Sequence, residues 1–370
     1  MKKLFRDIHL WLSLPLGILI TIVCLSGASL VFEQDITQAL QRPLYTVTPP
    51  AEGAQPLSPS QLVAHIRIQA GDSLHLTSLQ LSGNPEEAAF ASFRETGKKQ
   101  LSIDPYTGKV LGWTQSYPFF QTMRKLHRWL MNPPASKGEK SIGKVVVGIT
   151  TLAMVFILIS GLVIWVPRTR KALKNRLQVS FTKGWRRFWY DSHVAIGFYC
   201  TLFLLVMALT GLTWSFGWYR TAAYSLFGAE TQSPARTSSP TKEEKPEGKK
   251  QRAFDYAVWD QVASNLQAHY PVYKTLTLSE RNVQIIPNPN AIMHKADVVT
   301  FDARTGDIKE ISPYDERPRA QTMRGWFYAF HTGSWGGMIT KILYFLAALF
   351  GGILPLSGYY LWWKRTHRRN

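Results

Sequence analysis

The chain of 370 residues contains only two cysteines, Cys24 and Cys200, and both lie inside apolar stretches. Two such residues provide neither a disulfide framework nor a cysteine cluster for zinc or iron–sulfur binding. The sequence also lacks a Cys-x-x-Cys-His motif, a G-x-G-x-x-G loop and a P-loop. These absences exclude the usual sites for covalent c-type haem, nicotinamide cofactors and ATP.

Charged residues are missing from four long parts of the chain. No Lys, Arg, Asp or Glu occurs in residues 10–32, 145–166, 194–219 and 342–363. About 20 apolar helical residues span the roughly 30 Å hydrocarbon core of a bilayer. The alternation typical of a membrane β-barrel is not visible. The sequence therefore predicts an α-helical integral membrane protein with four transmembrane helices and a lipid bilayer around them.

The excess of positive charge is explained by this topology. The formal net charge is +19, but basic residues gather beside the apolar stretches, with Lys2, Lys3 and Arg6 before the first and Lys364 and Arg365 after the last. Eight more occupy the loop between the second and third stretches: Arg168, Arg170, Lys171, Lys174, Arg176, Lys183, Arg186 and Arg187. Cytoplasmic segments carry such an excess. Both termini and this loop are predicted to be cytoplasmic, and no nucleic-acid partner is expected.

The stretches divide the chain into membrane helices and two outer regions. Transmembrane helices are predicted at 8–32, 142–166, 191–216 and 337–363, with an interfacial helix at 119–131 and a basic cytoplasmic loop at 167–190. The outer regions, 33–118 and 217–330, each show a helical segment followed by strand-like runs, and each is predicted to be a small α+β domain. Residues 230–252 are rich in Pro, Ser, Lys and Glu and are predicted to be a disordered insertion.

Several features of the chain occur twice. The motif Asp-Pro-Tyr-Thr-Gly at 104–108 returns as Asp-Ala-Arg-Thr-Gly at 302–306, and Gln-Thr-Met-Arg occurs at 121–124 and 321–324. The first and third apolar stretches have a histidine 18 residues before a glycine, and the second and fourth both end in Ser-Gly with a Trp beyond. The shared order predicts two parallel repeats related by a pseudo-two-fold axis along the membrane normal.

Four of the nine histidines lie at the predicted membrane edges. His9 and His193 belong to the cytoplasmic edge, and His127 and His331 to the outer edge. The repeat makes the members of each pair equivalent, so the axis brings them face to face. Two facing neutral imidazoles form the ligand set of a non-covalent bis-histidine haem. We therefore predict four axial ligands to haem iron, two at each edge, and no catalytic side chain.

The neighbours of these histidines leave alternatives open. Arg124 and Arg324 lie three and seven residues before His127 and His331, on the same helical face. A guanidinium there can bind a haem propionate or remain solvated among lipid headgroups. Glycines 18 residues from His9 and His193 share their helical faces, and they provide space for a flat macrocycle or simply let helices approach closely. Four further histidines are predicted to be ordinary surface residues: His65, His75, His269 and His294.

The sequence resembles the PepSY-associated transmembrane family over nearly its whole length. The cues are short segments around the four histidines and at the ends of the second and fourth apolar stretches: 7–11, 126–130, 133–134, 143–144, 160–168, 191–193, 331–337 and 357–365. Within that family it is similar to inner-membrane siderophore reductases. The resemblance implies two b-type haems, periplasmic PepSY-like domains in a bacterial inner membrane, and reduction of ferric siderophores with electrons from a separate cytoplasmic or membrane donor.

Two other function classes stand beside this expectation. A sensor or assembly module would bind a periplasmic partner through its outer domains without redox chemistry. A permease for iron or its chelate is less favoured, because the four uncharged stretches contain no acidic residue to coordinate a cation. Haem content and Fe(II) release distinguish the three classes.

Overall fold

The computed structural model describes residues 2–71, 73–136, 139, 141–229, 254–291 and 295–367. The expected insertion at 230–252 lies outside these residues. The chain divides into two compact units, one formed from residues 1–34, 117–230 and 323–370 and the other from 35–116 and 231–322. The first unit holds the apolar helices and the second holds the strands.

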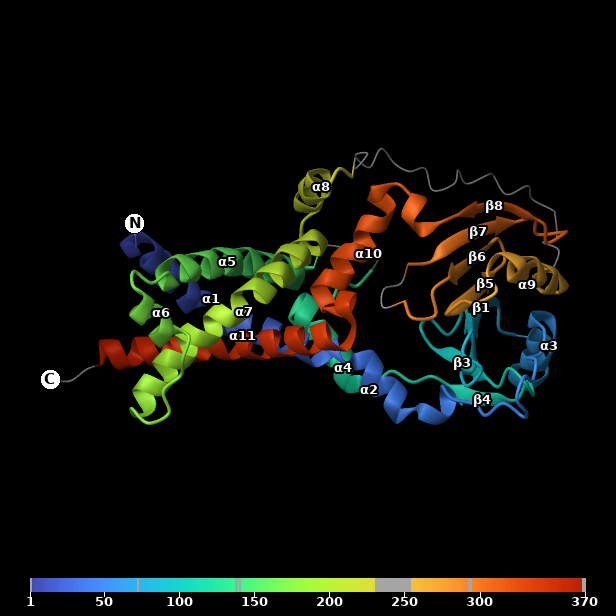
Figure 1. Cartoon of the computed structure of the whole chain (residues 1–370), viewed down its shortest axis with the longest axis horizontal. Helices are drawn as coiled ribbons and strands as arrows, with labels where there is room; N and C mark the ends of the chain where they lie inside the picture. Colours follow the sequence, from blue (N-terminus) through green and yellow to red (C-terminus); the bar gives the residue numbers. More distant parts are fainter. Residues whose placement is uncertain are drawn as a thin grey trace. The chain divides into compact units, whose positions relative to one another are not determined.

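The first unit is a bundle of four long helices (Figure 1). The helices are α1 (Lys2–Val31), α5 (Ile142–Trp165), α7 (Trp185–Ser215) and α11 (Gly337–Thr366). In the bundle α1 and α7 each pack against both α5 and α11. All four are long and apolar enough to cross a membrane. Among the described residues, the structure thus has the four candidate membrane-spanning helices that the sequence predicts.

The helices begin and end differently from the apolar stretches. The predicted third span began at residue 191, but α7 begins at Trp185 inside the basic loop, and α1 already begins at Lys2. The loop also contains α6 (Arg170–Arg176), whose first turn is capped by the Thr169 hydroxyl. Short helices complete the unit: α4 (Pro118–Trp129), α8 (Gly217–Leu226), the 3-10 turn η3 (Ser334–Gly336) and, from residue 323 onward, α10 (Arg319–Thr332). The expected interfacial helix at 119–131 corresponds to α4.

Basic residues tie several segments together at one end of the bundle. The Lys2 ammonium donates to the carbonyl of Val166 at 2.8 Å, and an Arg176 Nη1 donates to the carbonyl of Ile164 at 3.1 Å. The start of α1, the end of α5 and helix α6 therefore meet at this end, which we call the basic end. The last turn of α11, with Lys364 and Arg365, lies there too (Figure 1).

The second unit is built on one antiparallel sheet of eight strands in the order β4-β3-β2-β1-β5-β6-β7-β8. The strands are β1 (Leu76–Ser82), β2 (Ala89–Phe93), β3 (Gln100–Ile103), β4 (Val110–Trp113), β5 (Thr275–Ser279), β6 (Asn282–Ile286), β7 (Asp297–Phe301) and β8 (Ile308–Ser312). Helices α3 (Pro59–Ala70) and α9 (Ala257–His269) pack on it. Their shared core includes fully buried side chains from both halves: Leu62, Leu79, Leu101, Trp259, Leu266 and Ile285. Helix α2 (Glu33–Leu40) and the 3-10 turns η1 (Arg42–Leu44) and η2 (Tyr314–Glu316) are the remaining elements.

The sheet differs from the expected pair of separate outer domains. Strands β1 and β5 pair directly, with Ser78 opposite Ser279 and Gln80 opposite Thr277. Each outer segment supplies four strands, and alone it would leave β1 or β5 as an open edge. An exposed edge strand is a template for unwanted pairing. Joining β1 to β5 removes both edges, so the two segments form a single unit.

The repeated Asp-x-x-Thr-Gly motif is a tight turn in both places, not a chemical site. The amide of Gly108 donates to the carbonyl of Asp104 at 2.9 Å between β3 and β4, and Gly306 does the same to Asp302 between β7 and β8. Both glycines have positive φ, 69° and 78°. Glycine adopts this conformation without strain, which explains its place in the motif.

We expect Gly108→Ala to lower the thermal stability of the purified protein more than Gly97→Ala does. Both positions have positive φ, and a left-handed alanine costs about 1–2 kcal/mol. A Cβ at Gly108 would also lie 2.5 Å from His65 Cγ, whereas a Cβ at Gly97 meets open space. Crowding of this kind adds about 1–3 kcal/mol. Equal shifts in melting temperature for the two variants would contradict this assignment.

Candidate functional site

The four membrane-edge histidines form two facing pairs within the bundle unit. The imidazole centroids of His9 in α1 and His193 in α7 are 6.3 Å apart. Those of His127 in α4 and His331 in α10 are 6.0 Å apart. The structure therefore brings together the residues that the sequence paired, at both levels.

Each imidazole is anchored through its Nδ1 to a helix that is not its own. The partners are the carbonyl of Ile157 for His9 at 3.0 Å, that of Val23 for His127 at 2.8 Å, that of Met207 for His331 at 2.9 Å, and the hydroxyl of Ser357 for His193 at 2.7 Å. A carbonyl only accepts, and the Ser357 hydroxyl donates to the carbonyl of Leu354 at 2.7 Å. Nδ1 must therefore donate in all four rings. This tautomer leaves Nε2 unprotonated, as a metal ligand requires.

One local pattern provides all four anchoring points. A carbonyl is followed three residues later by Ser or Thr and then by Gly, at Val23 to Gly27, Ile157 to Gly161, Met207 to Gly211 and Leu354 to Gly358. The hydroxyl of each Ser or Thr lies 2.7–3.1 Å from that carbonyl, and the hydroxyls of Ser26 and Thr210 also donate over 2.6 Å to the carbonyls of Ile22 and Val206. We call each such segment, from the carbonyl residue to the glycine, the seat of the histidine that it anchors. The sequence signal for the four seats is the recurrence of the Ser/Thr-Gly pair.

The sequence left open whether these glycines provide space for a flat macrocycle or let helices approach closely. In the structure each glycine lies beside an imidazole ring from a neighbouring helix. A Cβ at Gly27 would lie 2.8 Å from His127 Cε1, and one at Gly161 or Gly211 would lie 3.1 Å from Cε1 of the facing histidine. At Gly358 the distance to His193 Cε1 is 3.6 Å. The missing side chains make room for imidazole rings from neighbouring helices, which fixes where each ring lies.

The pair formed by the short helices is neutral. Burial lowers the pKa of His127, and burial lowers the pKa of His331 to about 4, with His127 adding to the effect. Both rings are therefore uncharged at neutral pH. An uncharged imidazole is the form that binds metals.

The two pairs lie at two levels of the bundle. His9 is 14 residues before Val23 in α1, and His193 is 14 residues before Met207 in α7. Since Val23 and Met207 carry the seats for His127 and His331, the levels are separated by about 21 Å along these helices. That distance is a large part of the roughly 30 Å hydrocarbon core.

A cavity of about 390 Å³ opens at the level of His9 and His193. Its volume lies in the range of about 300–1,000 Å³ seen for small-molecule and cofactor sites. Both histidines line it, together with Gly161 and Gly358 from their seats. Three arginines from three different segments line it as well: Arg6, Arg176 and Arg365. The sequence assigns these arginines only to the cytoplasmic excess of positive charge, because no spacing connects them to the histidines.

The two arginines that the sequence singled out have different surroundings. The Arg124 guanidinium donates to the Glu33 carboxylate in an ion pair. Arg324 is exposed on α10 and lies near Tyr224. The sequence did not indicate Glu33 as a partner, because Glu33 and Arg124 are 91 residues apart and no pattern relates them.

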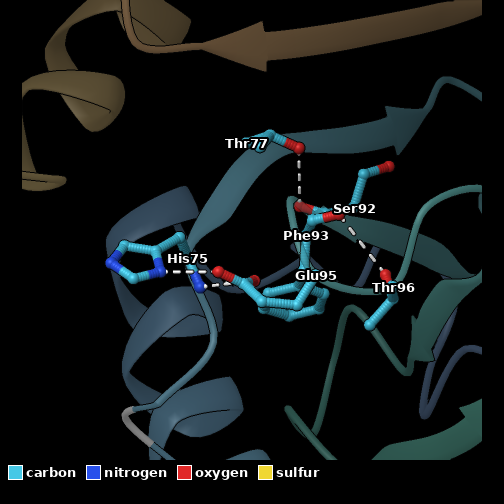
Figure 2. Close-up of polar contacts among 6 residues, drawn as sticks. All are labelled: His75, Thr77, Ser92, Phe93, Glu95 and Thr96. Atoms are coloured by element: carbon cyan, nitrogen blue, oxygen red, sulfur yellow. Dashed lines mark hydrogen bonds and ion pairs between the residues drawn. The ribbon is translucent and has the colours of Figure 1, made fainter. Parts of the chain in front are cut away.

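The described histidines of the strand unit lie at or near its surface. His75, whose side chain is 73% exposed, bonds through Nδ1 to the Glu95 carboxylate at 2.6 Å, as Figure 2 shows. This contact lowers the pKa of Glu95. His269 is exposed, and its Nδ1 donates to the carbonyl of Asn265 at 3.2 Å. His65 is half-buried on α3 beside Gly108. His294 lies outside the described residues.

Comparison with known protein families shows the family of the chain. A model of the PepSY-associated TM region matches residues 6–365. The chain belongs to this family. No curated protein matches it with significant similarity. The match includes all four histidines and their Ser/Thr-Gly seats.

The paired imidazoles of this PepSY-associated transmembrane protein fit the axial ligand set of haem. Two imidazoles that bind one metal from opposite sides, each with nitrogen about 2 Å from it, have ring centroids about 6 Å apart. The observed separations of 6.3 and 6.0 Å match that value at both levels. The anchored Nδ1 atoms supply the outer hydrogen bonds that metal-binding histidines normally make.

Proposed function

We propose that this protein is a di-haem oxidoreductase of the bacterial inner membrane that moves electrons outward to reduce ferric siderophores. It would be a haem-dependent ferric-siderophore reductase with two b-type haems, fed by a separate cytoplasmic or membrane electron donor. The observation that carries the proposal is the separation of the imidazole pairs, 6.3 Å for His9 and His193 and 6.0 Å for His127 and His331.

Haem, when bound, supplies reversible one-electron chemistry that no side chain of the chain provides. The protein's own residues would hold each haem, orient it and shield it from water. His9, His193, His127 and His331 are the proposed axial ligands. Three carbonyls, those of Ile157, Val23 and Met207, and the hydroxyl of Ser357 would fix the ring tautomers. The apolar helices around the two levels exclude water and keep the local dielectric low.

The contacts also support two parallel repeats and a cytoplasmic basic end. In the first half α1 carries His9 and seats His127, and in the second half α7 carries His193 and seats His331. The positive-inside rule assigns the end with Lys2, Arg176 and Arg365 to the cytoplasm. The eight-stranded sheet unit then belongs to the periplasm as one PepSY-like domain pair.

Ferric siderophores suit such a reductase as substrates. Siderophores bind Fe(III) with hard oxygen ligands, and such ligands hold the softer Fe(II) less tightly. One-electron reduction therefore frees iron for uptake while the organic carrier stays intact. The outer level, with His127 and His331, is the proposed point from which the substrate is reduced.

Trapping of Fe(II) tests this function directly. Haem-loaded protein is placed in vesicles with reductant inside, and a ferric hydroxamate with a chromogenic Fe(II) chelator is added outside. We expect colour to develop outside, and His9→Ala to reduce the rate to that of empty vesicles.

Two results would overturn the proposal, the first from this experiment and the second from a separate partner-binding assay. Iron that enters the lumen without external Fe(II) would indicate a permease. Haem-free binding of a periplasmic partner with no reduction would indicate a sensor or assembly module.

A further inference from the structure

The cavity beside His9 and His193 is strongly asymmetric in charge. Its lining includes Arg6, Arg176 and Arg365 but no Asp or Glu among the described residues. Asp7 comes only within 4.0 Å of Arg6, and both of these side chains are about half exposed. Three cations around one mostly apolar cavity without a lining carboxylate would be stabilised by an anionic ligand.

These arginines come from separate parts of the chain and are held at the same end. Arg176 is fixed by donation from Nη1 to the carbonyls of Ile164 and Trp165 at the end of α5. Arg6 lies near the start of α1 and Arg365 in the last turn of α11. Only tertiary packing brings the three arginines together, at the basic end of the bundle, where they line the cavity.

A buried donor in the same wall lacks an acceptor. The indole Nε1 of Trp165 is buried and has no hydrogen-bond partner among the described residues. The ring is stacked on Phe198, with centroids 3.7 Å apart and planes 8° apart, and both residues line the cavity. Buried donors nearly always have a partner. An acceptor atom of a ligand in this cavity would supply one.

We propose that Arg6, Arg176 and Arg365 bind the two carboxylates of the porphyrin at the His9–His193 level and that the Trp165 indole donates to the same carboxylate edge. The inference rests on the proposed haem function. It fixes the orientation of the ring, with its carboxylate edge toward the basic end and its apolar edge among the glycines and leucines of the bundle. The four residues would act as positioning residues, since they would contact the carboxylate edge of the ring and not the iron.

The test compares haem b with its dimethyl ester, which lacks the carboxylate charge. Both are titrated into haem-depleted full-length protein that carries His127→Ala, so that only the His9–His193 level is measured. We expect the ester to bind at least about tenfold more weakly than haem, a difference of about 1.4 kcal/mol. In the triple variant Arg6→Gln, Arg176→Gln, Arg365→Gln, this preference should disappear.

Further arms make the result decisive. Lys171→Gln removes a basic residue of α6 that does not line the cavity and should keep the full preference. Because nearby cations favour the reduced iron, Arg365→Gln should lower the midpoint potential of this haem alone in the otherwise unaltered protein. A triple variant that still prefers haem over its ester would overturn the inference and leave the proposed function standing. Absence of any haem binding would remove both.

Discussion

Replacing His127 with alanine should halve the haem content of the protein and leave its helices intact. The variant removes one proposed axial ligand of the His127–His331 pair, while His9 and His193 about 21 Å away keep their seats. We expect one haem per chain, with the remaining one still low-spin and reducible. Haem extraction, visible spectra and circular dichroism of the purified variant measure these three properties.

A matched control distinguishes the loss of a ligand from the loss of any histidine. His75→Ala removes an exposed imidazole that contacts only the surface carboxylate Glu95 in Figure 2 and should retain both haems. Simultaneous loss of both haems in His127→Ala would show that the two levels are not independent and that the assignment of ligands to levels is wrong.

Alanine at Gly27, Gly161 and Gly211 should weaken haem binding in a defined order, with Gly358 as the least affected of the four positions. The expected order follows the distance from the new Cβ to the imidazole Cε1: 2.8 Å at Gly27, 3.1 Å at Gly161 and Gly211, and 3.6 Å at Gly358. Gly27→Ala forces the His127 ring to move and breaks its bond to Val23. Crowding of about 1–3 kcal/mol corresponds to roughly 5- to 150-fold faster haem loss from that level. Gly358→Ala should resemble the unaltered protein.

The glycine series excludes an effect of helix propensity. Alanine favours a helix interior over glycine by about 1 kcal/mol, so each variant should be at least as helical as the original. Haem transfer to a scavenging apoprotein measures the loss rate at each level. Gly217→Ala at the start of α8 adds a control, since its Cβ would meet no atom of the described residues within 4 Å and Gly217 does not line the cavity. Equal loss rates for Gly27→Ala and Gly358→Ala would contradict the proposed seats.

The membrane helices could be predicted because lipid excludes charge. Four uncharged stretches locate four spans, but they do not locate helix ends. Trp185 to Tyr190 continue α7 into the basic loop, since a helix does not stop where the hydrocarbon ends. The pairing of β1 with β5 had no local signal, because Ser78 and Ser279 are joined by about 200 residues of intervening chain and both strands show ordinary alternation.

Only the histidine pairs of the site could be predicted from the sequence, because they follow from the internal repeats. Symmetry paired His9 with His193 and His127 with His331, and their proximity in the structure follows from it. The carbonyl seats were missed, although Ser/Thr-Gly recurs four times, because backbone acceptors leave no trace in side-chain chemistry. The cavity arginines were missed because Arg6, Arg176 and Arg365 converge only through helix packing.

The haem content of the purified, unaltered chain tests the central claim most directly. Protein from haem-replete cells should contain two haem b per chain, and dithionite should shift the Soret band and sharpen the visible bands, as expected for bis-histidine iron. A colourless preparation whose spectrum does not respond to dithionite would contradict the claim that the two imidazole pairs are iron ligands.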